Sequence, residues 1–261
     1  YNNDSDEMPA MGADNGLQLA DLTGKDYDDA DWDKLLDQLS FEDMATLINV
    51  GGWQTAEIKS VGKIATSDCD GPAGVNNFIT GTYGTPYPTE VLMAQTWNTD
   101  LLYDLGLAMG QEYADVNNYG VYGPAMNTHR SAFAGRNFEY YSEDGVLAGK
   151  LAAAQVNAMA TKGTYNYIKH FALNDQETNR CAFLLTYSNE QAIREIYLKP
   201  FELCIKNFDG TQIAVMSSFN WIGTVPACAN EDTLTTILRN EWGFQGMVIT
   251  DYDGSYGYMI T

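Results

Sequence analysis

The stretch VITDYDG, residues 248–254, joins a short apolar run to a pair of carboxyl groups. Val248 and Ile249 have the β-branched apolar character of a buried strand, and Asp251 follows at its end. In parallel α/β folds, chemistry gathers at the carboxyl ends of the strands. The stretch therefore predicts an α/β fold. Asp251 either begins a turn or holds a reacting atom, and we expect Asp253 to be solvated in the turn.

Amphipathic helices alternate with similar strands over most of the chain. Predicted helix N-caps are Ser40, Asn98, Ser142, Ser188 and Asn230, and predicted strands are 63–68, 90–97, 120–127, 166–172, 213–220 and 247–252. This alternation is typical of parallel βαβ units. A closed (β/α)₈ barrel needs eight units and only about six are found, so either an open sheet or most of a TIM-like barrel is predicted. We favour the barrel.

The chain begins with a stretch that lacks apolar periodicity. Residues 1–33 are polar and acidic, and we expect a lead-in or linker there, with the barrel domain over residues 34–261. The first residue is Tyr1 rather than Met. We therefore expect that a segment has been removed from the front of the chain or precedes Tyr1.

Composition excludes several functional classes. The net charge is −21, with 14 Lys and Arg against 35 Asp and Glu, which argues against binding nucleic-acid phosphates. No apolar run approaches the roughly 20 residues that span a bilayer, so no membrane partner is expected. The four cysteines show no CxxC spacing, and we expect neither a metal nor a cofactor. A soluble protein of bacterial type is predicted, cytoplasmic or secreted, with a homo-oligomer left open.

Polar and charged residues recur where the predicted strands end. These candidate residues include Asp70, Arg136, Lys169 and His170, together with Asp251. Structural alternatives remain for some of them: Asp70 begins a sequence that is typical of a turn, and Arg136 is spaced to pair with a nearby glutamate, Glu139 or Glu143. The charged pair at 169–170 is harder to explain this way, because it interrupts an apolar strand and is costly unless partnered. Such a set suits a polyhydroxylated ligand.

At these residues the chain resembles the catalytic barrel of glycoside hydrolase family 3, the β-glucosidase and β-xylosidase group. The segments that carry the resemblance are SDCDGPAG (67–74), GPAMNTHRSAFAGRNFEYYSED (123–144), KHFALNDQETNR (169–180), MSSFNWIGTVP (216–226) and LRNEWGFQGMVITDY (238–252). It covers nearly the whole chain from about residue 35, and the segments at 135–144 and 169–180 are long and specific.

The resemblance implies a retaining β-glycosidase that removes terminal β-D-glucosyl or β-xylosyl residues through a covalent glycosyl-Asp intermediate. It implies that Asp251 is the nucleophile. It also implies that sugar hydroxyls in the first subsite are held by Asp70, Arg136, Lys169 and His170, with Glu177 and Arg180 supporting them.

Two positions depart from the family pattern. Tyr252 stands where the family usually has Trp, and Phe219 stands where it usually has Tyr. Both are expected near the substrate and resemble a branch with reversed domain order. The two differences put in doubt which leaving group is preferred, and bear less on the class of reaction.

The general acid is the part that this sequence does not supply. In the family it is typically a Glu on an α/β sandwich domain, which in the reversed-order branch would precede Tyr1. We therefore expect that domain as a partner of this barrel, and assign the acid to neither Glu139 nor Asp253. Two other classes stay open: a Schiff-base lyase using Lys169, and a non-catalytic sugar-binding portion.

Overall fold

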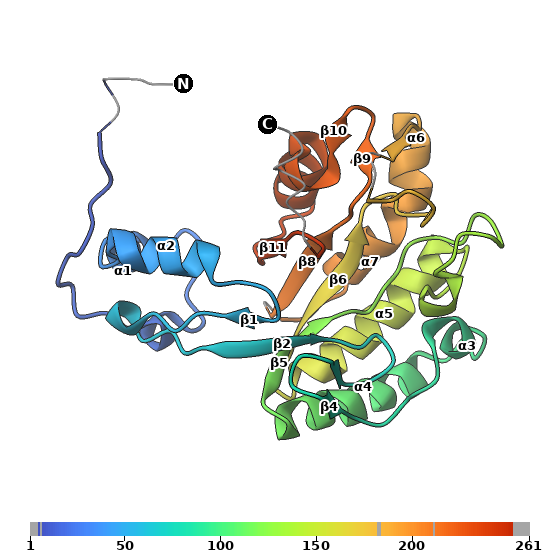
Figure 1. The fold of residues 1–261 in the computed structure, drawn as a ribbon, viewed down its shortest axis with the longest axis horizontal. Coiled ribbons are helices and arrows are strands. Elements are labelled where there is room, and N and C mark those ends of the chain that lie inside the picture. The colour runs from blue at the N-terminus through green and yellow to red at the C-terminus, as the bar shows by residue number, and fades with distance from the viewer. Residues whose placement is uncertain (1–4, 6, 182–183, 211, 253–261) are drawn as a thin grey trace. The chain divides into compact units, whose positions relative to one another are not determined.

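The computed structural model describes residues 5, 7–181, 184–210 and 212–252 of the 261-residue chain (Figure 1). It divides into two compact units, Tyr1–Ser67 and Asp68–Thr261. Asp253 lies outside the described residues, so its solvated position stays a prediction.

The first unit is small and contains short helices and little strand. It contains η1 (Leu19–Leu22), α1 (Asp31–Leu36), α2 (Phe41–Asn49), β1 (Gln54–Thr55), η2 (Lys59–Val61) and the first residues of β2 (Thr66–Asp70). Ser40 caps α2 as predicted: its hydroxyl accepts from the Asp43 amide at 3.0 Å, and the Asp43 carboxylate accepts from the Ser40 amide. Leu22 packs in one apolar cluster with Leu35, so part of the stretch 1–33 is folded into this unit. A domain boundary at residue 33 stays a prediction.

The second unit is built on a mostly parallel sheet. Its parallel strands are β5 (Asn118–Tyr122), β6 (Tyr165–Phe171), β8 (Ile213–Ser217) and β11 (Val248–Ile249). Among the described residues the order is β11-β8-β6-β5-β2-β3-β4, in which β3 (Asn76–Asn77) and β4 (Thr82–Tyr83) are antiparallel. A separate small sheet contains β7 (Leu185–Thr186), β9 (Trp221–Ile222) and β10 (Val225–Pro226). The parallel strands of the main sheet confirm the predicted βαβ units.

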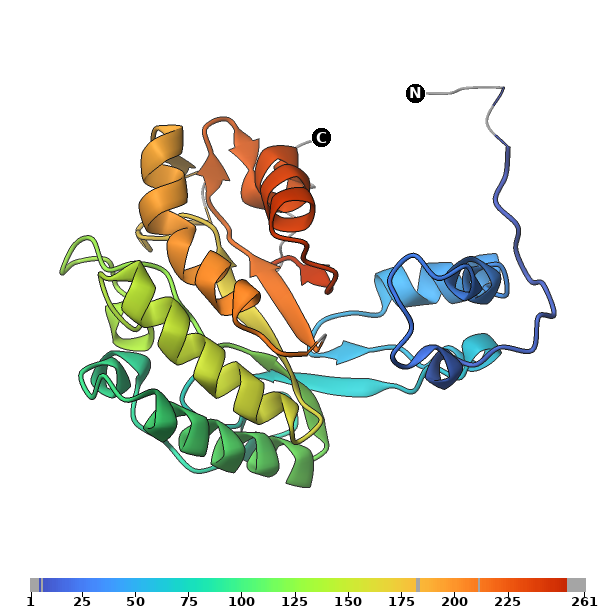
Figure 2. The ribbon, with the colours of Figure 1, turned by 180° about the vertical axis from the view of Figure 1, so that it is seen from behind.

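Helices α4 (Thr99–Asp115), α5 (Gly145–Ala160) and α7 (Lys199–Lys206) lie over one face of this sheet (Figure 2), and further helical elements belong to the same unit. These further elements are α3 (Glu90–Ala94), η3 (Asn137–Glu139), α6 (Glu190–Ala192), η4 (Ile193–Tyr197), η5 (Ala227–Ala229) and η6 (Asp232–Glu241). Figure 2 shows α5 between α4 and α7, and it packs against both. The backbones of α4 and α5 approach closely at Gly106, where a Cβ atom would lie 2.4 Å from the Gln155 carbonyl oxygen. Glycine is therefore required at this contact.

One predicted strand is wrong. Residues 90–97 contain the helix α3 instead of a strand. Glu90, Met93 and Ala94 are the buried residues of α3, which is the i, i+3, i+4 spacing of one helix face. A short apolar run cannot be assigned to helix or strand by its periodicity alone, and packing against the core decides here.

Two predicted helix caps are displaced by one or two residues. Asp144, not Ser142, caps α5: its carboxylate accepts from the Val146 amide at 2.7 Å. Asn189, not Ser188, caps α6. In each case the acceptor closer to the helix reaches the free amides of the first turn.

The caps predicted at Asn98 and Asn230 are confirmed, since their side-chain oxygens accept from the amides of Leu101 and Thr233. Within the described part of the chain, no helix combines the length and the apolar composition required to cross a bilayer.

Candidate active site

Side chains at the ends of β2 and β6 and just after β11 meet within the second unit. The Nζ atom of Lys169 lies 3.9 Å from Asp70 Oδ1, and the Nε2 atom of His170 lies 3.7 Å from Asp251 Oδ2. The parallel pairing of β6, β8 and β11 brings the ends of these strands to one edge of the sheet. The structure thus collects residues that are about 180 positions apart in the sequence.

Lys169 and His170 are consecutive, yet both reach this cluster. In a regular strand, neighbouring side chains point to opposite faces. The register between β6 and β8 shifts between Ile168 and Phe171, which is where the two residues lie. Asn127 holds the irregular segment: its amide nitrogen donates to the His170 carbonyl at 2.9 Å, and its oxygen accepts from the His170 amide at 2.7 Å. An irregularity of this kind redirects side chains.

Lys169 is buried between two carboxylates. Its side chain is only 5% exposed, and Nζ lies 3.9 Å from Asp70 and 4.0 Å from Glu139 Oε2. The other oxygen of Glu139 accepts from the Nε atom of Arg136. The predicted pairing of Arg136 with Glu139 is therefore present, and it belongs to the cluster rather than standing apart from it.

Glu177 joins two arginines. Its Oε2 atom accepts from Arg180 Nε at 2.9 Å, and its Oε1 atom lies 3.8 Å from Arg136 Nη1. Asn174 Nδ2 also donates to Oε1 at 2.9 Å. These contacts fix the glutamate and orient both guanidinium groups.

Asp251 is held by Arg180 and by its own loop. Arg180 Nη1 lies 3.4 Å from Asp251 Oδ2, and the Tyr252 amide donates to Oδ1 at 2.6 Å. The side chain is only 12% exposed. Burial raises the pKa of Asp251 above its ordinary value of 3.8, while the positive charge of Arg180 opposes that rise. Arg180 therefore helps to keep this carboxylate ionised.

The imidazole of His170 is neutral. Burial lowers its pKa well below the ordinary 6.5, and the positive charges of Arg136, Lys169 and Arg180 lower it further. Its contact with Asp251 is therefore not an ion pair. The Tyr140 hydroxyl lies 3.2 Å from Nδ1, and burial raises the pKa of Tyr140, so this hydroxyl stays protonated and can donate. The Asn174 carbonyl, at 3.5 Å, is a second acceptor for the same hydroxyl.

The two residues that depart from the family pattern lie beside Asp251 or its partner. The Arg180 guanidinium carbon stacks 4.6 Å from the centre of the Phe219 ring. Tyr252 follows Asp251 directly and is 66% exposed. An exposed aromatic ring next to a buried carboxylate offers a surface for an apolar or sugar group.

Sequence reasoning missed Tyr140, Asn174 and Glu90. The first two lie inside the motif segments, but only their contacts identify them. Glu90 is fully buried on α3, with no hydrogen-bond partner among the described residues, and its burial raises its pKa well above the ordinary value.

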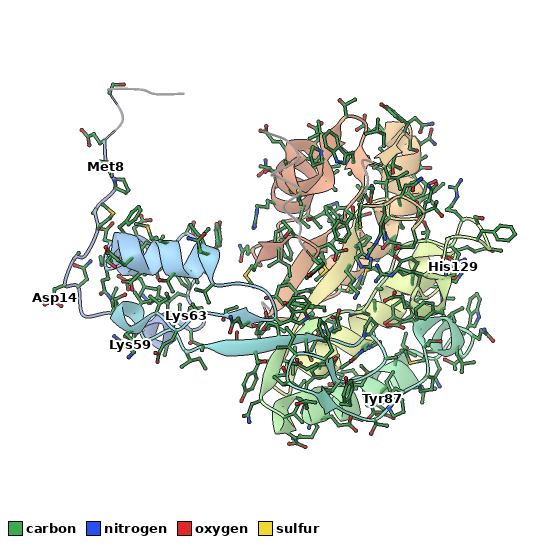
Figure 3. The ribbon with its side chains drawn as sticks, in the orientation of Figure 1. Met8, Asp14, Lys59, Lys63, Tyr87 and His129 are labelled. Atoms are coloured by element: carbon green, nitrogen blue, oxygen red, sulfur yellow. The ribbon has the colours of Figure 1, made fainter. Side chains whose placement is uncertain are left out.

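His129, labelled in Figure 3, lies on the loop after β5, and its Nε2 atom contacts the Tyr140 carbonyl at 2.7 Å. Its imidazole is thus engaged with backbone. Within the described residues no group of three or more His, Cys, Asp or Glu side chains is arranged to hold a metal ion.

The sequence and the fold of this chain are similar to those of known β-glucosidases. β-Glucosidase A of Butyrivibrio fibrisolvens is 42% identical over 225 residues, which are 83% of this chain and 27% of that protein. The structure of β-glucosidase 3B from Thermotoga neapolitana in complex with glucose has a TM-score of 0.75 and 38% identity, covering 84% of this chain and 33% of that one. A β-glucosidase structure from Paenibacillus barengoltzii has a TM-score of 0.83 and 35% identity, covering 94% and 27%.

The chain spans about a quarter to a third of the length of these relatives. Residues 41–259 match the sequence model of the glycosyl hydrolase family 3 N-terminal domain. This match, together with the mostly parallel sheet, confirms the predicted α/β fold of TIM-barrel type. The chain therefore belongs to glycoside hydrolase family 3.

Proposed function

We propose that this chain is the catalytic barrel of a retaining β-glycosidase that removes terminal β-D-glucosyl, or β-xylosyl, residues from β-glycosides. One observation carries the proposal: a continuous chain of alternating charges runs through the site. Its members in order are Asp251, Arg180, Glu177, Arg136, Glu139, Lys169 and Asp70. Such a network holds a carboxylate nucleophile at one end and hydrogen-bonding groups for sugar hydroxyls at the other.

In the proposed reaction, an Asp251 carboxylate oxygen attacks the anomeric carbon. The bond from that carbon to the glycosidic oxygen breaks, and the leaving oxygen takes a proton from a general acid. Water then gives a proton back to the deprotonated acid and attacks the same carbon, which releases the Asp251 carboxylate and gives a sugar with its original anomeric configuration. Ionisation of Asp251 is essential for the first step, and the charge of Arg180 at 3.4 Å favours it.

The sugar is proposed to be bound by Asp70, Lys169, His170 and Arg136, with Tyr252 and Phe219 nearer to the leaving group. Carboxylate, ammonium and guanidinium groups form charge-assisted hydrogen bonds to hydroxyls, which are stronger than neutral ones. The glucose held by the Thermotoga neapolitana relative supports a glucosyl group as the substrate moiety.

The general acid is proposed to be a Glu of an α/β sandwich domain that closes over this site. Retaining glycosidases hold their two carboxyl groups roughly 5–5.5 Å apart. Glu139 is unsuited to the role because Arg136 and Lys169 already hold its carboxylate. The relatives, which are three to four times as long as the matched segment, support such a partner.

A Schiff-base lyase is disfavoured. Its lysine must attack as a neutral amine, whereas Lys169 lies within 4.0 Å of two carboxylates. We expect no adduct when borohydride is added to the protein with an aldehyde or ketone substrate.

The test is covalent trapping with an activated 2-deoxy-2-fluoro-β-glucoside. This reagent has a leaving group that departs without an acid, so the nucleophile alone decides the outcome. Intact-mass spectrometry is expected to show one added fluoroglucosyl group, and peptide mapping to locate it on Asp251. A label on another residue would overturn the assignment. Binding of gluconolactone without any label would favour a non-catalytic sugar-binding role.

The acid side of the pH profile provides a second prediction. Because burial raises the pKa of Asp251, the acid limb of kcat/KM is expected above pH 3.8. Arg180→Gln removes the charge that opposes this rise, so the limb is expected to move to higher pH. Arg194→Gln serves as the control and should leave the limb in place, since Arg194 pairs with Glu190 and Glu241 and with no carboxylate of the candidate site among the described residues. If the acid limb of kcat/KM did not move in Arg180→Gln, the effect of Arg180 on the pKa of Asp251 would be contradicted.

A further inference from the structure

Tyr113 is a fully buried tyrosine whose hydroxyl reaches the backbone of the turn after β2. It lies on α4, and its oxygen is 2.9 Å from the Gly71 carbonyl and 3.2 Å from the carbonyls of both Asp70 and Gly74. Burial raises the pKa of Tyr113 well above its ordinary value, so the hydroxyl remains a donor. The hydroxyl has one proton to donate, and three carbonyl oxygens lie within hydrogen-bond distance of it.

The turn around this hydroxyl has no spare room. Gly71 has φ +138°, and a Cβ atom there would lie 1.7 Å from the Gly74 carbonyl oxygen and 2.2 Å from the Tyr113 hydroxyl. The Gly74 amide closes the turn by donating to the Gly71 carbonyl at 3.2 Å. The Tyr113 hydroxyl therefore occupies the space inside the turn, in contact with three of its carbonyl oxygens.

The same turn carries a residue of the proposed sugar subsite. Asp70 is the last residue of β2, and while its carbonyl oxygen contacts Tyr113, its carboxylate lies 3.9 Å from Lys169. The carboxylate is 38% exposed, whereas Tyr113 is completely buried. One peptide unit thus connects a buried anchor to an accessible hydrogen-bonding group.

We propose that Tyr113 is a positioning residue for the sugar subsite: its hydroxyl fixes the Asp70-Gly71 turn and thereby the carboxylate that receives a sugar hydroxyl. This inference rests on the proposed function, since it concerns the binding role of Asp70. Tyr113 does not touch substrate and acts only through the turn. Small displacements of groups that bind substrate reduce catalysis. Displacement of the Asp70 carboxylate is expected to weaken substrate binding and so to raise KM.

The experiment is a double-mutant cycle in the protein at its full natural length. Tyr113→Phe removes only the hydroxyl, and it is expected to raise KM for a β-glucoside about tenfold, with a smaller change in kcat. In the Asp70→Ala background the same change is expected to alter KM less than twofold, because a residue that acts through Asp70 has nothing further to lose. If Tyr113 had only a structural role, Tyr113→Phe would change KM by the same factor in the wild-type and Asp70→Ala backgrounds.

Tyr141→Phe is the matched control. Tyr141 is also buried, but its hydroxyl donates to Gln155 on α5 at 2.6 Å and contacts no part of the turn. It is expected to lower thermal stability in the way Tyr113→Phe does while leaving KM unchanged. The dissociation constant of gluconolactone is measured for each variant as a second readout of the subsite.

The outcomes separate this inference from the proposed function. Equal effects of Tyr113→Phe in both backgrounds, or an unchanged KM and lactone affinity, would overturn the positioning role while the function stands. An Asp70→Ala variant with wild-type KM and affinity would remove Asp70 from the subsite, and the inference with it. A wild-type protein that neither hydrolyses β-glucosides nor binds the lactone would overturn the proposed function itself.

Discussion

Replacing Asp251 with alanine is expected to lower kcat for β-glucoside hydrolysis by more than about a thousandfold, with the affinity for gluconolactone changed only a few-fold. The substitution removes the oxygen that would form the bond to the anomeric carbon. It leaves Asp70 and Lys169, 3.9 Å apart at the other end of the charge chain, to bind the sugar. Steady-state kinetics with a nitrophenyl β-glucoside measure the first quantity, and calorimetry measures the second.

Two controls separate chemistry from folding for Asp251. Asp144→Ala removes the cap of α5 and is expected to reduce stability by about 1 kcal/mol without a comparable loss of kcat. Azide added to Asp251→Ala should restore part of the turnover of an activated substrate and yield an α-glucosyl azide, because it attacks from the side that the carboxylate vacates. Near-normal kcat in Asp251→Ala would rule out the nucleophile assignment.

Replacing Lys169 with methionine is expected to lower kcat/KM by about a hundredfold or more. Methionine keeps an unbranched side chain but removes the charge, leaving the carboxylates of Asp70 and Glu139 without the ammonium that lies between them. Removing one partner of a buried charge pair costs about 2–5 kcal/mol, and each 1.4 kcal/mol is a factor of ten. The rate is measured on a β-glucoside and the folded state by thermal unfolding.

Lys199→Met is the matched control for this change. Lys199 also forms an ion pair, with Glu202 at 2.6 Å, but it lies on α7 and is about one-third exposed. Exposed pairs of this kind contribute little, so kcat/KM should be close to that of the wild type. A Lys169→Met variant that is as active as Lys199→Met would show that the buried ammonium does not hold the sugar.

Local sequence patterns predicted the elements that local interactions stabilise. The Ser40 and Asp43 capping pair needs only residues three apart, and it is present as expected. The caps at Ser142 and Ser188 were misplaced because a second acceptor stands closer to each helix, at Asp144 and Asn189. The run at 90–97 was misassigned because its apolar residues fit a strand until their contacts with the core are known.

The charged residues of the candidate site can be singled out from the sequence, but the contacts between them cannot. The positions of Lys169 and Asp251 at strand ends follow from the alternation of strands and helices. Their partners do not: Arg180 and Asp251 are 71 residues apart, and nothing local indicates that they meet. Tyr113 gave no signal in the sequence at all, because its function comes from a contact with a turn about 40 residues earlier.

The sequence by itself therefore determined the α/β class, the strand-end location of the polar residues and, through long specific motifs, membership in glycoside hydrolase family 3. Only the tertiary structure decided the charge state of His170 and the chain of ion pairs that ends at Asp251. The physical reason is the separation in sequence of the groups that interact. Caps and strand patterns depend on neighbours in sequence, whereas burial and electrostatic pairing depend on groups that the fold brings together.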